Sequence, residues 1–160
     1  MKTVSTIFLT IISLIIMVQS GYSQQVNIPY FSFYDLEGNV VTNENLDLNR
    51  STMIMMFDPY CDHCDKQAEM IVQAEDQFQD VQFVFVTIEP EIEPIKDFRK
   101  RHYGESSLEH VIFLQDKDFV FETYFGYTDD AINIYLYKPG EKHPKYFGKE
   151  QEAEKLLKFL

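Results

Sequence analysis

Two kinds of apolar pattern alternate through the middle of the chain. Continuous apolar runs rich in Met, Phe, Val and Ile occupy 52–57, 81–88 and 111–114, which is typical of strands buried on both faces. Between these runs, the residues of one face recur at steps of three and four from Cys64 to Phe78 and from Ile95 to His102, which predicts helices. Strand–helix–strand alternation predicts parallel strands joined by helical crossovers.

Shorter elements are predicted on both sides of this region. Before it, a turn at Glu37-Gly38 divides residues 31–42 into a β-hairpin, after which Asn43 is expected to cap one helical turn. After it come a short helix, a second hairpin and a closing helix, at about 119–125, 131–147 and 151–160. The fold class is therefore α/β, with a mixed central sheet, helices on both faces and an N-terminal β-hairpin.

The N-terminus has the layout of a secretory signal peptide. Lys2 precedes a mostly apolar run from Ile7 to Val18, and Gly21 and Ser23 supply small residues before a cleavage site. We expect residues 1–23 to be removed and 24–160 to form one domain in an exported protein. The run is short for a bilayer span, and the residues directly after it include no cysteine, so we expect no lipid anchor.

Charge and cysteine usage narrow the possible functions. The formal net charge of −12 at pH 7 argues against nucleic acid or anionic membrane as partners. The only two cysteines, Cys61 and Cys64, lie where the first buried strand gives way to its helix. In an exported chain such a pair can form a disulfide.

The position of the cysteines predicts redox chemistry. A helix N-terminus carries a partial positive charge that stabilises a thiolate, the reactive form of cysteine. Cys61 ends the loop and is expected to be the attacking thiol, whereas Cys64 lies one turn inside and is expected to resolve the mixed disulfide. His63 and Asp62 are predicted to tune the acidity of Cys61 in opposite directions, because an imidazolium favours the thiolate and a carboxylate opposes it. Asp58 and Asp65 are expected to add to that opposition.

Other readings of the motif stay open. A metal site built from the two cysteines and one distant histidine is compatible with the residues present, and so is an inert disulfide, although closing so short a loop would stabilise the fold little. We assign no metal ligands and no cofactor, because the cysteines themselves carry the electrons. His102 is expected at the edge of the core, and a basic group on its helix is expected to be solvated: Lys96, Arg99, Lys100 and Arg101.

Three segments are distributed along residues 24–160: the hairpin YFSFYDLEGNVVT, the cysteine motif MIMMFDPYCDHC and the later stretch YFGYTDDAINIYLYKPGEK. Together they resemble the thioredoxin-like superfamily, in particular exported thiol–disulfide oxidoreductases of the TlpA and ResA type. The resemblance implies a thioredoxin fold and disulfide exchange with protein substrates. It also implies a membrane redox partner that resets the pair, and a bacterial periplasmic location.

The resemblance also has departures. Tyr60 stands where the family often has Trp, and Tyr60, Pro59 and Ala131 are candidates for substrate contact. Ala131 occupies the place of the family's cis-proline, and the buried acid often found beneath the cysteines has no match, since Gln67 follows Cys64 by three residues. A non-catalytic binding module is therefore an alternative. Similarity to TlpA favours a reductase, whereas His63 favours a higher potential.

Overall fold

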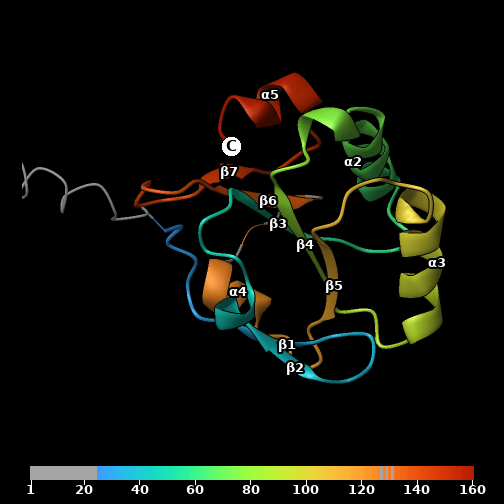
Figure 1. Cartoon of the computed structure of the whole chain (residues 1–160). Helices are drawn as coiled ribbons and strands as arrows, with labels where there is room; N and C mark the ends of the chain where they lie inside the picture. The colour runs from blue at the N-terminus through green and yellow to red at the C-terminus, as the bar shows by residue number, and fades with distance from the viewer. Residues whose placement is uncertain (1–24, 127, 129, 131) are drawn as a thin grey trace, which may run out of the picture.

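The computed structural model describes residues 25–126, 128, 130 and 132–160. The predicted signal peptide, residues 1–23, and Ala131 lie outside the described residues. Among those described, seven strands form one sheet with the order β2-β1-β5-β4-β3-β6-β7 (Figure 1). The strands are β1 (Ser32–Tyr34), β2 (Val40–Thr42), β3 (Thr52–Met56), β4 (Gln82–Thr87), β5 (Val111–Gln115), β6 (Asn133–Tyr137) and β7 (Lys145–Phe147).

The central strands β3, β4 and β5 are parallel, and the outer strands are antiparallel to their neighbours. Helices connect or follow the strands: α2 (Asp62–Gln73), α3 (Ile92–Tyr103), α4 (Phe121–Phe125) and α5 (Ala153–Leu157), with short 3₁₀ turns η1 (Asn43–Asn45) and η2 (Glu75–Gln77). This order confirms the predicted α/β class, the mixed sheet and the N-terminal hairpin. None of the helices in the described ranges is long and apolar enough to cross a membrane.

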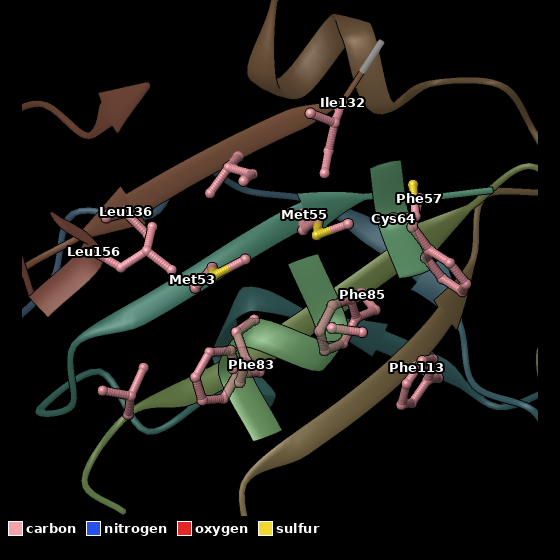
Figure 2. Close-up of a cluster of buried hydrophobic side chains, with 14 of the residues drawn as sticks. Met53, Met55, Phe57, Cys64, Phe83, Phe85, Phe113, Ile132, Leu136 and Leu156 are labelled. Atoms are coloured by element: carbon pink, nitrogen blue, oxygen red, sulfur yellow. The ribbon is translucent and has the colours of Figure 1, made fainter. Parts of the chain in front are cut away.

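Alternate side chains of the central strands build a core on each face of the sheet. Met53 and Met55 of β3 belong to the cluster beneath α2, α3 and α5, whereas Ile54 between them belongs to the cluster that α4 covers. In β4, Phe83 and Phe85 belong to the same cluster as Met53 and Met55, beneath α2, α3 and α5. Burial on both faces explains why the sequences of these strands are continuously apolar. Figure 2 shows that the first cluster includes Cys64 and Phe57.

Two boundaries differ from the sequence-based expectation. Thr42, not Asn43, caps the first helical turn: its Oγ1 accepts a hydrogen bond from Glu44 N at 3.3 Å, and Asn45 Oδ1 accepts one from Thr42 N at 2.8 Å. This reciprocal capping box gives the backbone N–H groups of Thr42 and Glu44 one acceptor each. A cap at Asn43 would not pair both groups. The closing helix is also shorter than predicted: α5 covers Ala153–Leu157, and the residues before it, 150–152, lie outside the helix and contact α2.

Candidate redox site

The cysteine pair lies at the carboxyl end of the central strand β3. The chain leaves β3 after Met56, and Phe57 N continues the sheet pairing by donating to Val86 O at 2.8 Å. Cys61 is the N-cap residue of α2, and its carbonyl accepts hydrogen bonds from Cys64 N and Asp65 N, both at 3.0 Å. No described side chain caps this helix end. Its first N–H groups therefore remain available to stabilise negative charge near Cys61.

The two sulfur atoms have different environments. Cys61 is partly exposed, whereas Cys64 is 1% exposed and packs in the cluster with Phe57 (Figure 2). Burial raises the pKa of Cys64 to about 12, the backbone of Asp58 lowers it, and a hydrogen bond with Cys61 raises it further. Cys64 is thus a thiol at neutral pH and within hydrogen-bonding distance of Cys61. This arrangement favours Cys61 for attack from solvent and Cys64 for attack on Cys61.

The two residues between the cysteines point away from the core. Asp62 is exposed, and none of the described cations forms an ion pair with it. His63 is about half exposed, at 48% for its side chain, and its Nδ1 lies 3.1 Å from Oε2 of Glu150. The positive charge that was expected to act on Cys61 therefore has a carboxylate partner from the C-terminal segment.

Asp65 also has partners that the sequence did not reveal. Arg101 Nη2 donates to its Oδ1 at 2.8 Å, and His102 Nε2 lies 2.7 Å from the same oxygen. Partial burial raises the pKa of Asp65, but the hydrogen bonds from Arg101 and His102 outweigh it and lower the pKa below its usual value. Because its charge is compensated, Asp65 opposes a Cys61 thiolate less than expected. The expectation that Arg101 is only solvated is wrong for the same reason.

The loop before the cysteines presents one aromatic side chain to solvent. Tyr60 is 69% exposed, and its backbone N–H donates to Oδ1 of Asp58 at 2.9 Å. Partial desolvation raises the pKa of Tyr60, and the charges of Glu89, Asp58 and Glu91 raise it further. Pro59 is buried, so of the two loop candidates only Tyr60 offers a side chain to a docking protein.

Residues on both sides of the third substrate-contact candidate, Ala131, form a hydrogen-bonded cluster, and Ala131 itself lies outside the described residues. The hydroxyl of Tyr146 lies 2.9 Å from both Thr128 Oγ1 and Asn133 Oδ1, and it also donates to Asp130. Burial raises the pKa of Tyr146 to about 12, with Asp130 adding to the rise. The cluster ties the segment before β6 to β7.

Gln67, a neutral amide, occupies the α2 position three residues after Cys64, which was compared with the buried acid that the resemblance implies. Gln67 is fully buried, and its side chain exchanges two hydrogen bonds with the backbone of Gln151: Nε2 donates to the carbonyl at 3.2 Å and Oε1 accepts from N–H at 2.7 Å. Sequence reasoning missed Glu150 and Gln151 as neighbours of the site. The sequence held one signal of these contacts: His63 and Gln67 are four residues apart, so both lie on one face of α2.

The described part of the chain holds no group of three or more His, Cys, Asp or Glu side chains arranged to bind a metal ion. His63 and His102 are instead hydrogen-bonded to Glu150 and Asp65.

Comparison with known proteins identifies the fold. No family model and no curated protein sequence matches the chain. Solved structures do match it. A secreted disulfide oxidoreductase of Mycobacterium tuberculosis homologous to DsbE is 16% identical over 77% of this chain and 86% of its own, with a TM-score of 0.60. DsbF of M. tuberculosis, solved in mixed oxidised and reduced forms, is 19% identical over 82% and 96% of the two chains, with a TM-score of 0.65.

A copper-bound structure also matches. ScoI of Arabidopsis thaliana, solved with copper, is 20% identical over 82% of this chain and 94% of its own, with a TM-score of 0.62. These similarities show a thioredoxin-like fold, as the sequence predicted.

Proposed function

We propose that this thioredoxin-like chain is an exported thiol–disulfide oxidoreductase that reduces disulfides in protein substrates. The observation that carries the proposal is the asymmetry of the pair, with Cys61 accessible at the start of α2 and Cys64 buried directly behind it. A structural disulfide would not require one sulfur to face solvent at a helix N-terminus. The N-terminal pattern of residues 1–23 supports export, and the similarity in fold to a secreted disulfide oxidoreductase supports it further.

The reaction proceeds in two exchanges. The Cys61 thiolate attacks one sulfur of a substrate disulfide, so that a Cys61–substrate disulfide forms and the other substrate sulfur leaves as a thiolate. Cys64, once deprotonated, attacks the Cys61 sulfur, which forms the Cys61–Cys64 disulfide and releases the second substrate sulfur as a thiolate. The substrate disulfide has gained two electrons and the cysteine pair has lost two. Both released thiolates take up protons from the site or from water.

The second exchange requires Cys64 to lose a proton that burial holds tightly. Gln67, three residues after Cys64, carries no titratable group, and the thiolate released in the first exchange supplies a proton acceptor at each turnover. Each cycle leaves the pair oxidised. A membrane redox partner would then reset it by donating two electrons through the same exchange in reverse.

The principal alternative is a thioredoxin-fold module that binds a metal or a partner without turnover. The similarity in fold to copper-bound ScoI is the observation that favours this alternative. Both readings use Cys61 and Cys64, but only the redox reading requires the two thiols to interconvert with a disulfide at potentials that cellular thiols reach.

One experiment separates these readings. The purified protein is equilibrated in glutathione buffers, the dithiol fraction is measured by mass spectrometry after alkylation, and insulin reduction is assayed alongside. We expect a reversible two-electron transition and catalysed insulin reduction, both lost in Cys61→Ser. A pair that does not exchange with glutathione, or a reduced form that holds copper or zinc in competition with a chelator, contradicts the proposal.

A further inference from the structure

Two residues of α2 attach the C-terminal segment to the redox helix. His63 and Gln67 are four residues apart and lie on the same helix face, where they contact the consecutive residues Glu150 and Gln151. The Gln67–Gln151 hydrogen bonds are buried and involve the backbone of Gln151. They fix the main chain next to Glu150, which brings the Glu150 carboxylate to the His63 ring.

Glu150 is ionised in this position. A hydrogen bond from its own backbone N–H lowers its pKa most, followed by the hydrogen bond with His63; these outweigh partial burial, which raises the pKa, and the charges of His63 and Lys66 lower it further. Its side chain is 26% exposed, less than that of His63 at 48%, so the carboxylate is the better sheltered member of the pair. The carboxylate therefore compensates the imidazolium charge whenever His63 is protonated.

We propose that Glu150 is a positioning residue of the redox site, which holds the His63 ring toward the C-terminal segment and cancels its charge, so that His63 contributes little to stabilising the Cys61 thiolate. The inference rests on the proposed function, because it concerns the direction of electron transfer at the same cysteine pair. An uncompensated imidazolium beside the cysteines stabilises the thiolate, and with it the dithiol form, which makes a pair more oxidising. Cancelling that charge moves the pair toward the reducing side.

The other charges near His63 support this balance. Asp62 precedes it and is exposed without a described cationic partner, so it also opposes a Cys61 thiolate. Lys66, one turn further along α2, contributes to the field at Glu150. With Glu150 in place, the imidazolium charge is paired, and the Asp62 carboxylate still opposes a Cys61 thiolate. Glu150 thus cancels the His63 charge, which is the feature of the motif that favours a higher reduction potential.

The test compares Glu150→Gln with the wild-type protein, with Glu152→Gln as a control that makes the same change in net charge at an exposed position two residues away. Equilibration with glutathione is measured at pH 5.5 and pH 8. At pH 5.5 we expect Glu150→Gln to shift the equilibrium toward the dithiol by about three- to tenfold. At pH 8 we expect it to match the wild type within about twofold, because the effect requires the imidazolium form of His63. A purely structural lesion would shift both measurements.

A second measurement does not depend on disulfide exchange. In a Cys64→Ser background, the rate of Cys61 alkylation by iodoacetamide reports its thiolate fraction, and we expect Glu150→Gln to raise this rate at pH 5.5 and Glu152→Gln to leave it unchanged. Adding His63→Ala to Glu150→Gln should abolish the increase. Equal alkylation rates of Glu150→Gln and its parent at pH 5.5 would overturn the inference. A wild-type protein that fails to exchange with glutathione would overturn the proposed function instead.

Discussion

Gln67 and Gln151 pair side chain to backbone through two hydrogen bonds, of 3.2 and 2.7 Å, across 84 residues of sequence. The pair joins the helix that carries the cysteines to the segment that leads into α5. Because Gln67 is fully buried, both hydrogen bonds are shielded from water. The C-terminal segment is therefore an integral part of the candidate redox site and not a separate appendage.

Replacing Gln67 tests how strongly this contact holds the fold. Gln67→Ala leaves the N–H and carbonyl of Gln151 without their partners and opens a cavity, so we expect the free energy of unfolding to fall by about 2–4 kcal/mol. Urea denaturation of the reduced protein, followed by circular dichroism, measures the change. Gln73→Ala, at the exposed end of the same helix, should change it by less than about 0.5 kcal/mol. Equal effects of the two substitutions would show that the contact contributes no stability.

The cluster of Asp65, Arg101 and His102 should make stability depend on pH. The folded-state pKa of Asp65 is lowered, so its contribution is present above the unfolded pKa of about 3.9 and is lost as the pH falls through the folded pKa. Because the Asp65 side chain is 34% exposed, we expect Asp65→Asn to cost only about 1 kcal/mol at pH 7. The cost should shrink as the pH falls from 7 to 3.

Urea denaturation at the two pH values measures this difference. Asp97→Asn, on the exposed face of α3, is the matched control, and we expect it to have little effect at either pH. A cost for Asp65→Asn that is the same at pH 3 and pH 7 would mean that the carboxylate charge is not what links α2 to α3.

The environments of the two sulfur atoms predict selective alkylation. With its pKa raised to about 12, Cys64 has on the order of one thiolate in 10⁴ molecules at pH 8. Burial of its sulfur also blocks access. In the reduced protein we therefore expect iodoacetamide to modify Cys61 at least about 100-fold faster than Cys64.

Peptide mapping by mass spectrometry after short exposures identifies the modified residue. Cys61→Ser should become nearly unreactive, whereas Cys64→Ser should react readily. If Cys64 were labelled first, the assignment of Cys61 as the attacking thiol would have to be reversed.

The exposed ring of Tyr60 should act on protein substrates and not on small disulfides. At 69% exposure beside Cys61, it offers the kind of aromatic surface on which protein contacts concentrate. We expect Tyr60→Ala to lower kcat/KM for insulin by about three- to tenfold while exchange with glutathione disulfide stays the same. Tyr30→Ala removes an aromatic of similar exposure outside the cysteine loop and serves as the control. A parallel loss with both substrates would indicate damage to the cysteines themselves.

Much of the fold was predictable because its signals are local. The run from Thr52 to Phe57 has too few polar residues to face water, so a buried strand there followed directly, and β3 occupies Thr52–Met56. The three- and four-residue steps after Cys64 predicted α2 in the same way. The cap at Thr42 was missed because Thr42 and Asn43 are adjacent residues that both favour capping, and only the hydrogen bond from Thr42 to Asn45 distinguishes them.

The candidate site was predictable only in part. The helix position of Cys61 and Cys64 could be inferred, because helix periodicity determines which residues share the first turn. The partners of the neighbouring charges could not. Glu150 lies 87 residues from His63, and Arg101 lies 36 residues from Asp65. A basic residue on a helix and an acidic residue near the C-terminus have no local feature that separates a solvated charge from a paired one.

The sequence by itself determined the alternation of strands and helices and the place of the cysteines at a helix start, because these follow from the spacing of residues within one or two turns. The tertiary structure decided which charges act on those cysteines. Packing of α3 against α2 brought Arg101 and His102 to Asp65, and the extended segment before α5 brought Glu150 to His63. Electrostatic effects depend on distance in space, and distances between residues far apart in sequence exist only once the sheet has formed.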